Sequence, residues 1–124
     1  MRIAACLAIL LTAGAAQAQQ PGRENFRAAT AADLARVCSA AVSGVDPNHQ
    51  LAFCHGVLAG AYGYFDSTVP AADRFVCLPT NPSPSRAKVA EGFVAWLKAR
   101  PQYNGDGAID ALFRYAAEVF PCKR

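Results

Sequence analysis

The residues best suited to chemistry in this 124-residue chain are five cysteines and two histidines. Cys54 and His55 are adjacent, and His49 stands five residues before Cys54. A thiol beside an imidazole can act as a nucleophile with its base. On a helix, however, adjacent residues point in different directions, and residues 49 and 54 lie about a turn and a half apart. The pattern therefore predicts no thiol–imidazole pair, and both histidines are interpreted as partly exposed helix residues.

The other polar residues form no recognisable catalytic or metal-binding motif. The sequence contains no C-x-x-C, H-x-x-x-H or H-E-x-x-H segment, no G-x-S-x-G turn and no glycine-rich phosphate loop. Asp66, Asp73 and Asp110 are too scattered along the chain to predict a carboxylate pair. We therefore expect a protein that is not an enzyme and that binds no metal or cofactor.

The N-terminus is typical of an export signal. Met1-Arg2 is a short positive start, residues 3–11 are apolar, and Ala16-Gln17-Ala18 is an A-x-A cleavage pattern. Residues 1–18 are therefore predicted to be a signal peptide, cleaved near Ala18, that directs the protein to the bacterial periplasm. No later stretch approaches the roughly 20 apolar residues of a membrane span, so we expect no stable membrane anchor.

The part of the chain after Ala18 is predicted to be a flexible N-terminus over 19–29 and one domain over 30–124. Loss of Arg2 leaves 11 basic against 9 acidic residues. This balance is too even to favour nucleic acid or an anionic membrane as a partner. The same part has 20 Ala against 13 Val, Ile and Thr together, a composition that favours helices over strands.

Capping residues and apolar spacing predict four helices joined as two hairpins. The first helix begins at Thr30, with Asp33 in the capping-box position, and ends at Gly44. The second begins at Asp46-Pro47. A proline-rich connection spans 66–85, the third helix starts within 83–85 and stops before Pro101, and the fourth follows the 104–107 turn and stops before Pro121. The expected core residues are Leu34, Val37, Cys38, Ala41, Leu51, Cys54, Leu58, Ala61, Phe65, Val89, Phe93, Val94, Trp96, Leu97, Ile109, Leu112, Phe113, Tyr115, Ala116, Val119 and Phe120.

Four cysteines follow the predicted signal, and they allow three pairings. If the first two helices turn back near Gly44, Cys38 and Cys54 reach the same level of the hairpin. Cys77 would then pair with Cys122 and hold the end of the last helix. In the chain-entropy model these closures contribute roughly 3 and 4 kcal/mol. The fold class predicted is a small all-α domain of four to five helices stapled by two disulfides.

Two features of the second helix indicate contact with another surface. Gly56 and Gly60 leave a smooth strip, which we expect to pack against another helix of the same chain, the alternative being a seam between two copies. Tyr62, Tyr64 and Phe65 cannot all be buried on one helix face, so one or two are available to a partner.

Several short motifs follow one another with family-like spacing: Cys54-x-Gly56-x-x-x-Gly60, Cys77-Leu78-Pro79, an amphipathic helix ending before Pro101, and Phe120-Pro121-Cys122. This ordered set resembles the Rap/Tai immunity-protein family from about Leu34 to Cys122. One departure is Val57, because the position after the first glycine is commonly aromatic in that family.

The resemblance implies a small exported helical protein, often a homodimer, without catalysis of its own. Such proteins protect a bacterium in its periplasm against cell-wall amidase toxins delivered by type VI secretion, by binding the toxin and occluding its active site. A rigid scaffold with an exposed loop suits such binding. The expected contact residues are Asp66, Ser67, Asp73 and Arg74 in the connection and Tyr103 and Asn104 in the later turn.

Two other classes of protein fit the sequence less well. A periplasmic acid-stress chaperone would have to open at low pH. Nine acidic residues and two histidines provide only a modest number of groups whose protonation could drive that opening. A small periplasmic enzyme would need a catalytic set, and the sequence contains no such motif.

Overall fold

The computed structural model describes residues 22–123, and that part of the chain contains four α-helices and no β-strand. The helices are α1 (Ala31–Cys38), α2 (Pro47–Thr68), α3 (Arg86–Lys98) and α4 (Ala108–Val119). Three short 3-10 turns accompany them: η1 (Asn25–Arg27), η2 (Ala71–Asp73) and η3 (Pro101–Tyr103). The predicted signal peptide lies outside the described residues. Within them, no helix has the length and apolarity needed to span a membrane.

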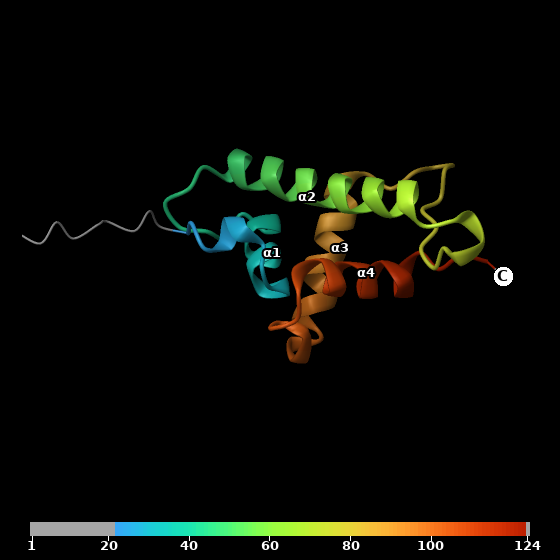
Figure 1. The fold of residues 1–124 in the computed structure, drawn as a ribbon. Coiled ribbons are helices and arrows are strands. Elements are labelled where there is room, and N and C mark those ends of the chain that lie inside the picture. The colour runs from blue at the N-terminus through green and yellow to red at the C-terminus, as the bar shows by residue number, and fades with distance from the viewer. Residues whose placement is uncertain (1–21, 124) are drawn as a thin grey trace, which may run out of the picture.

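The helices cross one another around a single core. α2 runs along one side, α4 lies on the other, and α3 crosses between them, while α1 packs near the N-terminal half of α2 (Figure 1). Although α1 is short, it contacts each of the other three α-helices. The most completely buried large side chains are Phe93, Leu34, Gln50, Val37, Val76 and Cys54.

Side-chain caps fix the starts of α1, α2 and α3, as the sequence predicts, whereas Gly107 before α4 provides no such cap. The Thr30 hydroxyl accepts a hydrogen bond from the Asp33 amide at 3.2 Å, and the Asp33 carboxylate accepts one from the Thr30 amide at 3.0 Å. Asp46 Oδ1 caps α2 by accepting from the Asn48 amide at 2.8 Å. Ser85 Oγ accepts from the Lys88 amide at 3.1 Å at the start of α3. Each cap satisfies amide groups that the helix itself leaves unpaired.

The first helix ends earlier than predicted, at Cys38 rather than Gly44. Ala40 has a left-handed backbone with φ of 52°, and Ala41, expected in the core, is exposed. The buried Gln50 amide holds the following turn: its Oε1 accepts from the Val42 amide at 2.9 Å, and its Nε2 donates to the Val42 carbonyl at 3.0 Å. These hydrogen bonds pair the Val42 amide and carbonyl, which in this turn have no helical partner.

The two disulfides join the pairs that the hairpin arrangement predicts. Cys38–Cys54 fastens α1 to α2, and Cys77–Cys122 fastens the long connection to the end of the chain. Beside the second disulfide, the Cys77 amide donates to the Phe120 carbonyl at 2.8 Å. The connection after α2 is therefore tied to the segment that follows α4.

The packed domain includes residues before 30, which were expected to be flexible. Asn25 in η1 is buried, and its side-chain amide donates to Asp33 Oδ1 at 3.0 Å. The Phe26 ring packs edge-on against Phe53, with 5.1 Å between ring centroids. Residues 25–27 thus cover one side of the hairpin formed by α1 and α2.

Two residues of α4 that were expected in the core lie on its exposed outer face. Ile109 and Val119 are 43% and 50% exposed, because no other described element covers that side of the helix. Tyr115, which the helical spacing of the aromatic residues places in the core, is buried as expected. A Cβ at Gly92 would overlap the Tyr115 hydroxyl, so this glycine allows α3 and α4 to approach closely.

Candidate protein-binding surface

Two exposed aromatic side chains lie near the C-terminal end of α2. Tyr64 is 74% exposed and Phe75 is 50% exposed, whereas Phe65 is buried. The helical period accounts for the difference between Tyr64 and Phe65, because adjacent residues point to different sides of α2. Residues 64–75 are called the end segment below, and they lie at the same end of the molecule as the C-terminus (Figure 1).

An ion pair closes the end segment into a loop. Arg74 Nη1 lies 2.7 Å from Asp66 Oδ1, and its Nη2 donates to the Asp66 carbonyl. Arg74 Nε also donates to the Val69 carbonyl at 3.1 Å. These two residues, which the sequence analysis expects to contact a partner, therefore hold the loop in shape.

The other two predicted residues of this segment differ in their bonding. The Ser67 hydroxyl donates to the Tyr64 carbonyl at 3.0 Å, so it is engaged within α2. Asp73 is exposed in η2, and its carboxylate makes no hydrogen bond or ion pair within residues 22–123. Of the four predicted contact residues here, Asp73 has its hydrogen-bonding side chain open to solvent.

The end segment packs against α4 through a cluster of aromatic rings. The Phe65 ring lies 5.1 Å from Phe75 and 5.0 Å from Phe113 of α4, measured between ring centroids. Phe75 thus packs one side of its ring against the cluster and leaves the rest exposed. Sequence reasoning missed Phe75, because its only signal was an aromatic residue two positions before a cysteine.

Tyr103 and Asn104 lie at a different corner, around η3, away from the end of α2 (Figure 1). The Tyr103 ring stacks on Trp96 with 5.4 Å between centroids and 5° between planes. The Arg114 guanidinium lies 4.8 Å from the centre of the Tyr103 ring. The Asn104 carbonyl accepts from the Ala32 amide at 3.1 Å. The two sets of predicted contact residues therefore do not form one surface.

The predicted helix-packing glycines have no packing partner. A Cβ added at Gly56 or Gly60 would meet no atom within 4 Å, so no element of the described chain approaches either position closely. The expected internal contact is wrong here, since the side of α2 that carries these glycines is exposed. The strip is open to a second surface from another molecule.

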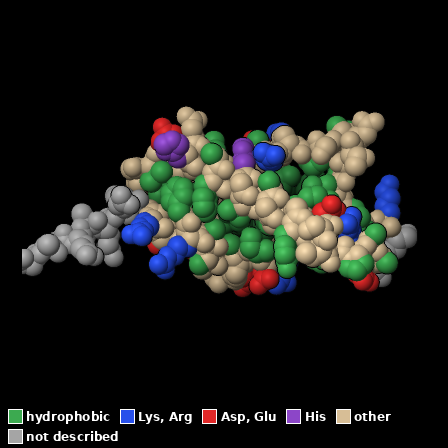
Figure 2. Space-filling view, turned by 45° about the horizontal axis from the view of Figure 1, so that its top comes forward, with side chains coloured by type: hydrophobic (Ala, Val, Ile, Leu, Met, Phe, Trp, Pro, Cys, Tyr) green, Lys and Arg blue, Asp and Glu red, His purple; other side chains and the backbone are tan. Residues whose placement is uncertain are grey.

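The cysteine and histidine residues form no reactive group. Cys54 is buried in its disulfide, His55 is half-buried and His49 is exposed. Across residues 22–123, no three His, Cys, Asp or Glu side chains are grouped as a metal site would require. On the face shown in Figure 2, hydrophobic side chains gather across the middle, and acidic and basic side chains are dispersed around them.

Comparison with known proteins adds one finding. The sequence model of a family described as Rap1a immunity proteins matches residues 30–122, from the α1 cap to the last cysteine. No curated protein and no solved structure matches the chain significantly.

Proposed function

The chain belongs to the Rap1a immunity protein family, and we propose that it protects its cell by binding a cell-wall amidase toxin and occluding the toxin's active site. The family match over residues 30–122 carries the proposal, and it confirms the resemblance found from the cysteine and glycine motifs. The coarser conclusion, an immunity protein against an effector protein, follows from the family. The amidase target, its delivery by type VI secretion and the periplasmic site are parts of the proposal.

Two observations support the periplasmic site. Disulfides persist in oxidising compartments such as the periplasm, and both disulfides here join residues of the packed domain. The N-terminal pattern of Met1-Arg2, an apolar run and Ala16-Gln17-Ala18 is that of a cleaved signal peptide. We propose cleavage near Ala18.

The end segment is the surface that we propose for the toxin. Exposed aromatic side chains are frequent anchors at protein interfaces, and this segment carries two of them, Tyr64 and Phe75, together with the open carboxylate of Asp73. The Asp66–Arg74 ion pair and the nearby Cys77–Cys122 disulfide restrict the loop before binding. A loop that is already ordered loses less conformational entropy on association. The turn at Tyr103 and Asn104 is a second, separate candidate surface.

The homodimer that the family resemblance implies would use the open strip at Gly56 and Gly60 on α2. Small residues let two helix backbones approach closely, and nothing within the described chain occupies this strip. Sedimentation of the wild type beside Gly60→Leu tests the assignment. A dimer that becomes a monomer in the variant supports it, and a dimer that persists contradicts it.

A capture experiment tests the function itself. The tagged, oxidised protein without residues 1–18 is mixed with lysate and secreted fractions of its own organism, and the bound proteins are identified by mass spectrometry. We expect stoichiometric capture of a cell-wall amidase and inhibition of that amidase in vitro. Capture of a different protein class, or an amidase that stays fully active when bound, would contradict the proposal.

Single substitutions then test the surface. We expect Tyr64→Ala and Phe75→Ala each to weaken amidase binding by roughly 30-fold, as expected for aromatic anchors at an interface. Ile109→Ala removes a comparably exposed apolar side chain from α4 and should leave binding unchanged. Equal effects of all three variants would contradict the assignment of the end segment.

The acid-stress chaperone alternative has its own test. Such a chaperone must loosen at roughly pH 2 to 3, where carboxyl groups are protonated. Circular dichroism and client aggregation at that pH decide the question. A retained helical signal without client protection excludes this alternative.

A further inference from the structure

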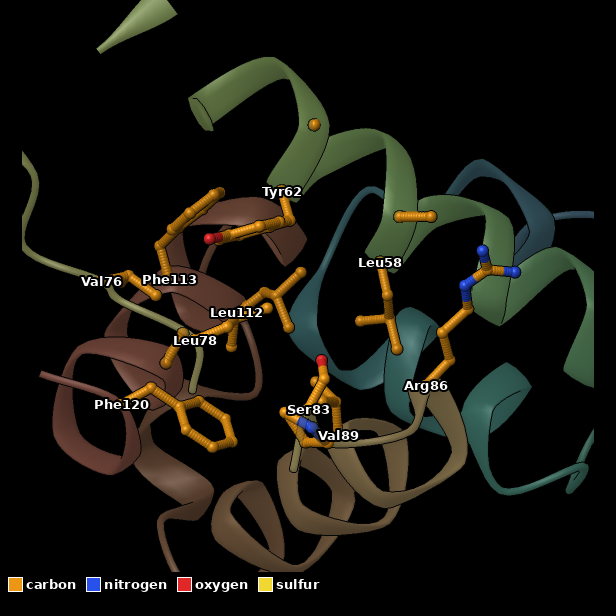
Figure 3. Close-up of a pocket in the computed structure, with 14 residues that line it drawn as sticks. Leu58, Tyr62, Val76, Leu78, Ser83, Arg86, Val89, Leu112, Phe113 and Phe120 are labelled. Atoms are coloured by element: carbon orange, nitrogen blue, oxygen red, sulfur yellow. The ribbon is translucent and has the colours of Figure 1, made fainter. Parts of the chain in front are cut away.

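A pocket of about 350 Å³ lies beside the end segment, and its lining includes Gly63 and Val76 but neither Tyr64 nor Phe75. It is formed by α2, α3, α4 and the connection between Val76 and Pro84 (Figure 3). Leu58, Leu112 and Val89 come from the three helices, and Leu78 from the connection. Its volume is within the range of pockets that bind small molecules.

The lining of the pocket is apolar with three polar groups. The labelled side chains in Figure 3 surround the space, and the hydroxyls of Tyr62 and Ser83 and the guanidinium of Arg86 are the polar groups among them. Among residues 22–123, no acidic residue and no charged residue other than Arg86 lines the pocket. Such a lining favours a ligand with an apolar body and few polar atoms.

Arg86 gives the pocket its charge. It is the first residue of α3 and stands at the edge of the pocket toward α2 (Figure 3). The ion pairs found within residues 22–123 do not include it, and the first turn of α3 contains no acidic residue. An exposed guanidinium without a carboxylate partner is suited to bind an anion, because it donates two parallel hydrogen bonds to a carboxylate.

We infer that the pocket binds a small amphiphilic carboxylic acid, with its aliphatic chain among Leu58, Val89 and Leu112 and its carboxylate at Arg86. Apolar surface left in a pocket is costly to hydrate, and an aliphatic chain removes it from water. Because Arg86 is the one charged residue that the described part of the chain contributes to the lining, an anionic head group is preferred over a neutral or cationic one. The pocket is surrounded by four chain segments, a shape that suits a small molecule. The surface of a protein partner is better matched by the exposed side chains of Tyr64 and Phe75.

The test uses decanoate and its neutral analogue decanol as probes. Each is titrated into the oxidised protein and followed by calorimetry and by amide chemical shifts. We expect saturable one-to-one binding of decanoate, with shifts confined to residues around the pocket. Unsaturable binding, or shifts spread over the surface, would overturn the inference.

Gly63 supplies a variant that blocks the pocket without a clash. Gly63 lines the pocket, and a Cβ there would meet no atom within 4 Å. Gly63→Leu should therefore fold and reduce decanoate affinity by more than roughly tenfold, because the leucine occupies the apolar space. Gly56→Leu is the matched control on the same helix, since Gly56 is equally open but does not line the pocket. Equal binding by the two variants would contradict the location.

The role of Arg86 is tested by charge removal. Arg86→Gln should weaken decanoate binding by roughly tenfold, because a hydrogen bond to a charged group is lost, and leave decanol binding unchanged. Arg27→Gln removes an exposed cation elsewhere and should change neither. If Arg86→Gln leaves the decanoate affinity at the wild-type value, the carboxylate assignment is wrong. None of these outcomes depends on the proposed immunity function.

Discussion

At the scale of single residues, Glu118 connects α4 to α3 and to the chain after it. Its Oε2 accepts from Trp96 Nε1 at 2.8 Å and from Arg100 Nη2 at 3.0 Å. Trp96 is buried, so its indole N–H would lose its partner if the carboxylate were removed. We expect Glu118→Ala to lower the free energy of unfolding by about 1–2 kcal/mol, measured by urea denaturation.

Glu91 offers a matched control for Glu118. Its carboxylate pairs with Lys88 at 3.0 Å, but both side chains are more than half exposed. Exposed pairs of this kind contribute little, so Glu91→Ala should cost less than about 0.5 kcal/mol. If the two alanine variants lost the same stability, the buried indole contact would not be the cause.

Asp33 makes the stability of the domain depend on pH. Burial raises the pKa of its carboxyl, but hydrogen bonds from the Thr30 hydroxyl, the Thr30 amide and the Asn25 side chain outweigh this, so the pKa lies below its ordinary value. A carboxyl with a lowered folded-state pKa stabilises the fold above its unfolded-state pKa of 3.8, and this contribution is lost as the pH falls through the folded-state pKa.

The lowered pKa of Asp33 determines how its substitution should depend on pH. We expect Asp33→Asn to be less stable than the wild type at pH 7, by about 1 kcal/mol, because the hydrogen bonds from Thr30 and Asn25 lose their charged acceptor. The difference should shrink as the pH falls below about 4. Urea denaturation at several pH values measures it. A difference that stays constant with pH would show that the charge of Asp33 plays no part.

At the scale of elements, three glycines on two helices should respond to substitution with opposite sign. Gly56 and Gly60 lie within α2 with open space around them, so alanine at either position should stabilise the fold by about 1 kcal/mol through helix propensity. At Gly92 on α3 the added methyl would overlap the buried Tyr115 hydroxyl, and Gly92→Ala should destabilise the fold by at least about 1 kcal/mol. Thermal unfolding of the three variants measures both effects. Stabilisation by Gly92→Ala would show that Tyr115 moves aside without cost.

The helix starts could be predicted from sequence, because a cap is a local interaction. Thr30, Asp46 and Ser85 each bond an amide within three residues of themselves. The end of α1 could not be predicted, since it depends on Gln50 reaching back to Val42 from the next helix. Ala40 and Ala41 are good helix formers that follow the helix end, and the Gln50 contact that holds the turn lies eight residues along the chain from Val42.

The candidate surface was predicted only in part, for the same reason. The period of α2 predicts that Tyr64 and Phe65 face different ways. The Asp66–Arg74 pair depends on the path of the chain through η2, which no local pattern specifies. The exposure of Ile109 and Val119 likewise depends on which elements cover α4. A helical period indicates that a face is apolar, but not whether another helix packs on it.

At the scale of the whole molecule, the two disulfides hold different parts of the fold. Cys38–Cys54 lies in the core between α1 and α2, where both residues are buried. Cys77–Cys122 lies at the end of the molecule that carries the end segment, with Cys77 exposed and Cys122 half-buried. Thiolate exchange requires access to a sulfur, so the two bonds should differ in how readily they are reduced.

We expect dithiothreitol to reduce Cys77–Cys122 before Cys38–Cys54 in the native protein. Because the Cys77–Cys122 loop of 45 residues is the longer one, its loss should remove about 4 kcal/mol in the chain-entropy model. The core disulfide should open only as the domain unfolds, since its sulfurs are covered. Timed thiol labelling with peptide mass spectrometry gives the order, and urea denaturation of the Cys77→Ser, Cys122→Ser double variant gives the stability. Labelling of Cys38 and Cys54 first would mean that α1 separates from α2 more easily than the end segment separates from the C-terminus, and that the end segment belongs to the more stable part of the fold.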